Sequence, residues 1–268
     1  MGKTIGIISI KGGVGKTTLS AALAADLANH YEKKVLLIDA NYSAPNLGAH
    51  MDIMKPEKTL HDVIAGKLRI QSAIHNRYGV DVVPGSYVYE KRINPLKLRD
   101  RIARIKENYD FVILDSSPSL NEEILSVILA SDNLFVVSTP DYPTLVCSFR
   151  AARLAKQRGR PISGIIVNKI REPKYEVEMG EIESMTGIPV VARIPDDSNS
   201  IKALFTRIPI PIYNKKSKFA KELDRLSKAL VGKREKFSIF RRLFSSDFRQ
   251  EEVNRQILKE SFYKRLFE

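Results

Sequence analysis

The chain has 268 residues, of which 43% are hydrophobic and 28% charged, so it can bury a core and is not a disordered chain. No apolar run approaches the roughly 18 residues of a membrane-spanning helix, and the first residues lack the pattern of a secretory signal. The formal net charge is +13, which suggests an anionic partner. A single cysteine excludes intrachain disulfides and cysteine-only metal sites, and we expect an intracellular protein.

Short runs rich in Ile and Val predict β-strands, and segments with helical spacing alternate with them. The strands are expected at 4–10, 34–39, 80–83, 111–115, 134–138, 162–168 and 190–194. The helices are expected at 16–30, 59–65, 95–108, 121–130, 144–158, 175–186, 198–207 and 215–231. Because the apolar strands are continuous rather than alternating, we expect both faces of the sheet to be buried. The pattern predicts a doubly wound α/β fold with a mostly parallel sheet.

The character of the chain changes after Gly232, which is expected to end the last helix of the domain. Residues 233–268 contain no strand-like run and mix basic residues with Phe, Leu and Ile. We therefore predict a globular domain over 1–232 and a basic amphipathic tail over 233–268.

A glycine-rich loop lies between the first predicted strand and the first predicted helix. It differs from the general P-loop pattern, because Ile10 occupies the position of the first glycine and an extra lysine, Lys11, precedes the loop. Backbone N–H groups of such a loop bind phosphate oxygens, and the N-terminus of the following helix favours the anion. Lys16 would contact the β- and γ-phosphates, and the Thr17 hydroxyl would bind Mg²⁺. The predicted phosphate-binding residues are Gly12, Gly13, Val14, Gly15, Lys16, Thr17 and Thr18.

The positive charge is concentrated in two segments. Residues 91–106 contain seven basic residues and one acid, and residues 215–268 contain sixteen basic and eight acidic residues. Concentrated positive charge suggests nucleic acid or an anionic membrane as partner, and an ordinary solvated face is the alternative.

The tail contains two similar amphipathic pieces. On a helix, each piece has aromatic and aliphatic residues on one face and basic residues on the other, which is typical of a helix that lies on a membrane surface. Packing on the domain or on a partner protein would require a similar pattern. The predicted membrane-contacting residues are Phe237, Phe240, Arg241, Arg242, Leu243, Phe244, Phe262, Lys264, Arg265, Leu266 and Phe267.

Several motifs together resemble a known family. Residues 11–18 resemble the deviant Walker A motif of the MinD/ParA ATPases, and 36–41 and 113–118 resemble the two strands and switches that follow it. Residues 167–169 and 194–197 resemble the loops that contact the nucleotide base. The segments 44–48 and 59–66 are similar to archaeal MinD-like sequences in particular.

The resemblance implies roles for individual residues. Lys11 would reach the phosphates of the partner subunit in an ATP-dependent homodimer, where a second cation would neutralise the charge that develops during phosphoryl transfer. Asp39 and Asp115, with Thr17, would hold Mg²⁺ and its waters. Asn168 would bind the adenine edge beside the loop that contains Pro195 and Asp196. Asp141 would lie near the dimer interface, or would simply cap a helix.

Two positions depart from the family pattern. Asn41 replaces the acid that is usual two residues after the first switch aspartate and that is linked to the attacking water. Its amide can hydrogen-bond a water but cannot accept its proton, so we expect slow hydrolysis. The second switch reads Asp115-Ser116-Ser117-Pro118-Ser119, which is one residue longer before the proline and lacks the usual glycine.

The resemblance therefore implies a MinD-like ATPase with ATP and Mg²⁺ as cofactors, cytoplasmic and peripherally membrane-associated. Its ATP cycle would control association with an anionic membrane surface and so position a cargo or a division site, with an activating protein that the sequence does not name. Two alternatives stay open: a ParA-like ATPase that binds DNA, and a nucleotide-gated regulator or scaffold of a protein partner.

Overall fold

A single twisted sheet of eight strands organises the chain. The computed structural model describes residues 2–89, 91–160 and 162–233, so the predicted membrane-contacting residues of the tail lie outside the described part. The strand order is β3-β4-β2-β5-β1-β6-β7-β8, and all neighbours are parallel except β3 and β4. The strands are β1 (Lys3–Ile8), β2 (Val35–Ala40), β3 (His75–Arg77), β4 (Val80–Val83), β5 (Phe111–Ser116), β6 (Asn133–Ser138), β7 (Ile162–Ile170) and β8 (Val190–Pro195).

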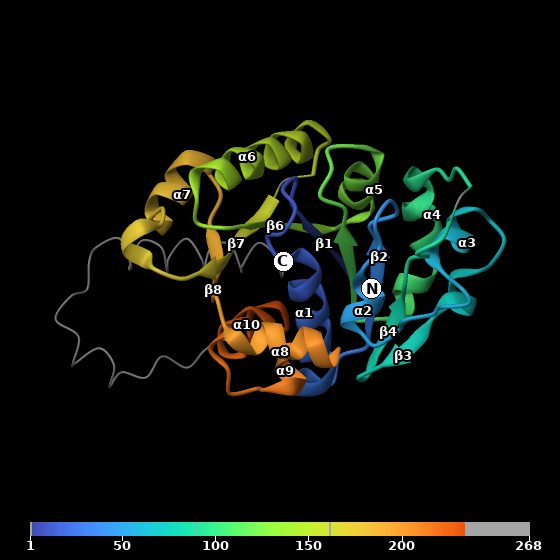
Figure 1. Ribbon diagram of the computed structural model, residues 1–268. Helices are drawn as coiled ribbons and strands as arrows, with labels where there is room; N and C mark the ends of the chain where they lie inside the picture. Colours follow the sequence, from blue (N-terminus) through green and yellow to red (C-terminus); the bar gives the residue numbers. More distant parts are fainter. Residues whose placement is uncertain (1, 90, 161, 234–268) are drawn as a thin grey trace.

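Helices cover both faces of the sheet (Figure 1). The α-helices are α1 (Lys16–Tyr31), α2 (Leu47–His50), α3 (Leu60–Ile64), α4 (Leu98–Ile102), α5 (Glu122–Ala130), α6 (Tyr142–Gln157), α7 (Met179–Thr186), α8 (Ser198–Thr206), α9 (Ile210–Tyr213) and α10 (Lys218–Leu230). The 3₁₀ turns are η1 (Ile70–Ala73), η2 (Pro95–Lys97), η3 (Ile105–Asn108) and η4 (Pro173–Tyr175). The predicted doubly wound α/β fold is confirmed.

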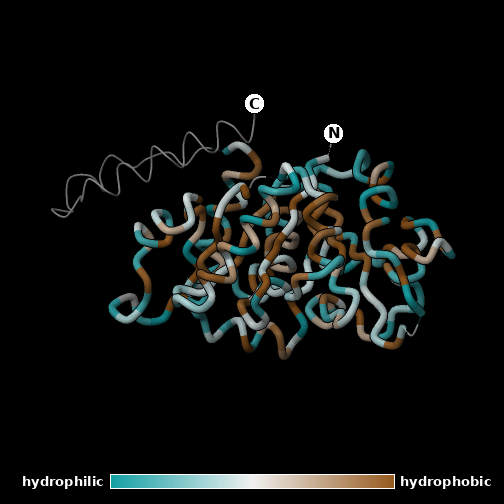
Figure 2. Tube along the Cα trace, turned by 90° about the horizontal axis from the view of Figure 1, so that it is seen from above, coloured by the Kyte–Doolittle hydropathy of each residue, from teal (hydrophilic) through white to brown (hydrophobic). Residues whose placement is uncertain are grey.

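Two hydrophobic cores lie on opposite faces of the sheet, because successive residues of a strand point to opposite sides. In β2, Leu37 belongs to the core under α1, α8, α9 and α10, whereas Leu36 and Ile38 belong to the core under α3 to α7. Figure 2 shows the hydrophobic stretches in the middle of the molecule and hydrophilic stretches around its periphery. Burial on both faces explains why the strands read as continuous apolar runs.

Some predicted elements differ from the structure. The edge strand β3 was not predicted, because its residues are polar and partly exposed; the turn Tyr78-Gly79, with φ of 52° and 73°, pairs it with β4 as a tight hairpin. The single helix predicted at 95–108 is instead η2, α4 and η3, which together bury Leu98, Ile102 and Ile105. Gly232 follows α10 with φ of 73°, as expected for a helix-ending glycine.

Within residues 2–89, 91–160 and 162–233, no helix combines the length and the hydrophobicity that a membrane crossing needs.

Candidate functional site

The glycine-rich loop connects the carboxyl end of β1 to the N-terminus of α1, as the sequence predicts. Gly13 and Gly15 have φ of 78° and 93°, a left-handed conformation that side chains rarely adopt. Lys16 begins α1 and is only 7% exposed. Burial lowers the pKa of Lys16, and the negative charge of Asp115 opposes this shift. The loop therefore presents backbone N–H groups and one lysine at a helix N-terminus, a site that suits phosphate.

Asn168, in β7, packs directly against this loop. Its Nδ2 donates to the carbonyl oxygen of Val14 at 2.8 Å, and its side chain is buried. A Cβ added to Gly15 would lie 2.4 Å from this Nδ2. The Asn168 side chain therefore supports the phosphate loop through Nδ2.

Replacing Gly15 with alanine is expected to weaken ADP binding more than tenfold, because the new Cβ would displace Asn168 and strain a backbone with φ of 93°, at a cost of about 1–3 kcal/mol. Titration calorimetry with Mg·ADP measures the affinity. Gly159→Ala is the matched control: Gly159 also has positive φ, but nothing lies within 4 Å of an added Cβ. Gly159→Ala should lower thermal stability without changing the affinity, and an equal loss of affinity in both variants would contradict the role of the loop.

Two buried carboxylates lie side by side next to the loop. Asp39 in β2 and Asp115 in β5 are register partners on adjacent parallel strands, and both side chains are 0% exposed. Burial, followed by the charge of Asp115, raises the pKa of Asp39 to about 8, and the backbone N–H groups that bond its carboxylate oppose the shift. Burial also raises the pKa of Asp115, against the effects of Thr17, Lys16 and Ser20. A divalent cation would remove the repulsion that this arrangement creates.

The neighbouring groups hold the pair in place and leave acceptors free. Asp39 accepts from the backbone N–H groups of Asn41 (3.2 Å), Asn46 (3.1 Å) and Leu47 (3.0 Å), and Asp115 Oδ1 accepts from Ser20 Oγ at 3.0 Å. Among the described residues, Asp115 Oδ2 and Asn41 Oδ1 are buried without a hydrogen-bond partner. Such orphaned oxygens fit the waters around Mg²⁺, which keeps several waters and few carboxylates.

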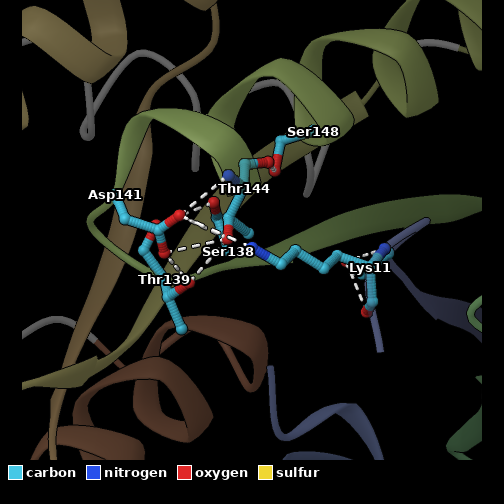
Figure 3. Close-up of polar contacts among 7 residues, drawn as sticks. Lys11, Ser138, Thr139, Asp141, Thr144 and Ser148 are labelled. Atoms are coloured by element: carbon cyan, nitrogen blue, oxygen red, sulfur yellow. Dashed lines mark hydrogen bonds and ion pairs between the residues drawn. The ribbon is translucent and has the colours of Figure 1, made fainter. Parts of the chain in front are cut away.

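Lys11 and Asp141 form an ion pair beside the loop (Figure 3). Lys11 Nζ lies 3.7 Å from Asp141 Oδ1, and both side chains are more than 40% exposed, so the pair contributes little stability. Asp141 also caps α6 by accepting from the Thr144 N–H at 2.9 Å, which confirms the capping alternative. Burial raises the pKa of Asp141, but hydrogen bonds from Thr139 and Thr144 and the charge of Lys11 outweigh it and leave the pKa below its usual value.

The remaining predicted residues lie at the same carboxyl edge of the sheet. Pro195 ends β8, next to β7, and the Asp196 carboxylate accepts from Arg171 Nε at 2.6 Å. Thr17 follows Lys16 in the first turn of α1. Thr18 Oγ1 lies 3.3 Å from Nε2 of His50 in α2. The structure therefore brings all described candidate residues to one edge of the sheet, although Asp196 is already engaged by Arg171.

Sequence reasoning missed three polar neighbours of the site. Ser20 bonds Asp115, His50 contacts Thr18, and the buried hydroxyl of Ser117 has no hydrogen-bond partner within the described segments. Ser20 carries a local signal, because it lies one helical turn after Lys16 and shares its face. Ser117 carries one as well, because it lies two residues after Asp115 in the second switch. The contact of His50 with Thr18 depends on how α2 lies against α1.

Comparisons with known proteins agree with this geometry. A family model described as an AAA domain matches residues 2–146, more than half of the chain. An uncharacterized ATP-binding protein of Methanocaldococcus jannaschii is 32% identical over 231 residues, which cover 85% of this chain and 88% of that protein. The septum site-determining protein MinD of Thermotoga maritima is 29% identical over 87% of this chain and 89% of its own length. The solved structure of MinD from Pyrococcus horikoshii with Mg-ADP has a TM-score of 0.80 and 28% identity, covering 85% of this chain and 95% of that chain.

Proposed function

Since this chain belongs to the MinD/ParA family of ATPases, we propose that it binds Mg·ATP, dimerises in the ATP state and hydrolyses ATP slowly, and that this cycle switches its association with a membrane surface. The observation that carries the proposal is the buried pair Asp39 and Asp115 beside Lys16 at the phosphate loop. This combination supplies both a phosphate site and a divalent-cation site.

Different residues would bind different parts of the nucleotide and its Mg²⁺. Backbone N–H groups of residues 12–16 and the Lys16 ammonium hold the phosphates, and Asp39, Asp115 and Thr17 hold Mg²⁺ with its waters. Mg²⁺ held by these residues would neutralise part of the phosphate charge. Asn168 Oδ1 would accept a hydrogen bond from the amino group of adenine. The Mg-ADP bound to the Pyrococcus horikoshii structure supports this choice of cofactors.

The proposal of slow hydrolysis rests on Asn41. Its Nδ2 donates to the Ala44 carbonyl at 2.6 Å, and its Oδ1 is the buried acceptor that can orient a water. Because an amide cannot accept the proton of that water, the chain must rely on positioning and on the charges of Lys11 and Lys16.

The membrane part of the proposal rests on the amphipathic tail of residues 233–268, which follows α10. An anchor with a few large apolar residues binds weakly, and dimerisation doubles the number of anchors without any new contact. Membrane binding would therefore follow the nucleotide state, and the protein would act as a peripheral, cytoplasmic switch that positions a partner or a division site.

The full chain is expected to sediment with vesicles of phosphatidylcholine and phosphatidylglycerol in ATP and less in ADP. Leu243→Asp should reduce sedimentation at least tenfold, because it places a charge on the apolar face of the first tail piece. Ser238→Asp, which adds the same charge to the polar face, is the control and should change sedimentation little. If the sedimented fraction is the same in ATP and ADP and is unchanged by Leu243→Asp, the tail is not a nucleotide-gated membrane anchor.

A second candidate function is binding of DNA by the same dimer. It is favoured by exposed basic residues on two helices of one face of the sheet, Arg99 and Arg104 near α4 and Arg150 and Arg153 on α6. This alternative predicts ATP-dependent binding to duplexes of any sequence that weakens steeply with salt.

A further inference from the structure

The helices α8 and α9 expose an unusual set of apolar side chains. Ile201 is 75% exposed, Leu204 47% and Phe205 87%, and Ile212 and Tyr213 of α9 are 39% and 38% exposed. We call these five residues the α8–α9 surface. Residues 201, 204 and 205 have helical i, i+3, i+4 spacing and so share one side of α8. Clustered exposed apolar residues of this kind mark interaction sites.

The opposite side of α8 fixes it firmly to the domain. Ala203 is buried in the core under α1 together with Ile210 of α9 and Phe219 of α10. Asp197 caps α8 by accepting from the Asn199 N–H at 2.9 Å, and it also accepts from the Phe219 N–H at 3.3 Å. The exposed residues therefore lie on the side of α8 that faces away from the core.

The segment that carries the α8–α9 surface is basic. Residues 198–221 contain no Asp or Glu. The basic side chains of this segment are all exposed: Lys202, Arg207, Lys215, Lys216, Lys218 and Lys221. One of them, Arg207, forms an ion pair with Asp52 at 3.2 Å. Exposed apolar side chains in a segment whose charged side chains are all basic are the composition of a surface that binds an anionic bilayer.

We propose that the α8–α9 surface is a second membrane contact, in which Ile201, Leu204 and Phe205 enter the headgroup region of an anionic bilayer and the surrounding lysines contact lipid phosphates. This proposal rests on the proposed membrane association and assigns part of it to the folded domain. A membrane interface generally needs two signals for stable attachment, and the tail alone supplies weak anchors. Figure 1 shows α8, α9 and α10 together in one layer, and α10 is the helix that leads into residues 233–268.

Charge argues against other occupants of this surface. The tail has ten basic and six acidic residues over 233–268, so it would be repelled by the lysines, as would a second copy of the same surface. Nucleic acid would pair with the lysines but would leave Phe205 and Ile201 in water. An anionic bilayer satisfies both the charges and the apolar side chains.

The chain contains no tryptophan, so Phe205→Trp in the full chain gives a clean fluorescent reporter at the centre of the surface. With Mg·ATP and vesicles of phosphatidylcholine and phosphatidylglycerol, its emission should shift to shorter wavelength, and brominated acyl chains should quench it. Tyr175→Trp is the matched control, because Tyr175 in η4 is 78% exposed but belongs neither to α8 nor to α9, and its emission should not change. In a second variant, Phe205→Ser with Ile201→Ser should weaken vesicle binding at least tenfold, because two apolar side chains no longer leave water.

The outcomes separate the two proposals. If the Phe205→Trp variant sediments with vesicles but its indole emission is neither shifted nor quenched, the α8–α9 contact is wrong and the tail-based function stands. If the protein does not sediment in either nucleotide, both proposals fail. Quenching that is equally strong in vesicles of phosphatidylcholine alone would overturn the role of the lysines, and a shift produced by duplex DNA but not by vesicles would assign the surface to nucleic acid.

Discussion

Without Mg²⁺, the free energy of unfolding is expected to fall as the pH rises from about 4 to about 8, by up to about 1.4 kcal/mol per pH unit for Asp39, and Asp39→Asn should make this slope shallower. The pKa of Asp39 is raised to about 8 in the folded chain, first by burial and then by Asp115. In this range the folded state holds a proton that the unfolded state releases. The stabilisation is therefore complete below the pKa that Asp39 has in the unfolded chain. It is lost as the pH approaches the pKa that Asp39 has in the folded chain.

Urea denaturation at several pH values, with chelator and then with Mg·ADP, measures this effect. Bound Mg²⁺ favours the ionised carboxylates, so Mg·ADP should flatten the slope. Asp100→Asn is the control, because Asp100 is an exposed residue of α4, and it should leave the slope as in the natural chain. A slope as steep in Asp39→Asn as in the natural chain would show that Asp39 does not contribute to the pH dependence.

Asp39→Asn is also expected to lower ATP turnover about 100-fold or more, because it removes one of the two carboxylates that would position Mg²⁺ and its waters. Nucleotide affinity should fall less, because the loop and Lys16 do not depend on Asp39. If Asp39→Asn turns over ATP nearly as fast as the natural chain, Asp39 does not contribute to the cation site.

The sequence was sufficient to predict the position of candidate residues that lie next to one another in the chain or at the ends of strands. The loop 12–18 was predictable because its glycines, its lysine and the start of α1 are contiguous, and Asp39 and Asp115 were predictable because each lies near the end of an apolar strand. Their contact follows from the pairing of β2 with β5, since parallel strands bring their carboxyl ends to one edge.

The partners of these residues could not be predicted in the same way. The bond from Asn168 to Val14 joins residues 154 positions apart, and the pair Lys11–Asp141 joins two loops. Such contacts depend on side-chain packing across strands, which leaves no periodic pattern in the sequence. Polar β3 was missed for a related reason: its position comes from the hairpin turn at Tyr78-Gly79, not from hydrophobic burial.

The second large effect is expected from Lys11→Ala, which should lower ATP turnover about 10³-fold or more while leaving ADP affinity unchanged, if Lys11 acts on the phosphates of a partner subunit. In the single chain, Lys11 Nζ lies 3.7 Å from Asp141 and is 43% exposed, so this lysine is free to leave a weak ion pair. Lys16, by contrast, is buried at the loop of its own chain and should be required for binding itself.

Mixing two inactive variants distinguishes action across the dimer from action within one chain. Lys11→Ala keeps an intact cation site, and Asp39→Asn keeps an intact Lys11. In a mixed dimer, the site on the Lys11→Ala subunit receives Lys11 from its partner, so an equal mixture should regain about a quarter of the natural turnover, because half the dimers are mixed and each has one complete site. If cross-linking shows that mixed dimers form but turnover does not return, Lys11 acts within its own chain, and the ion pair with Asp141 then marks a position from which it reaches its own phosphates.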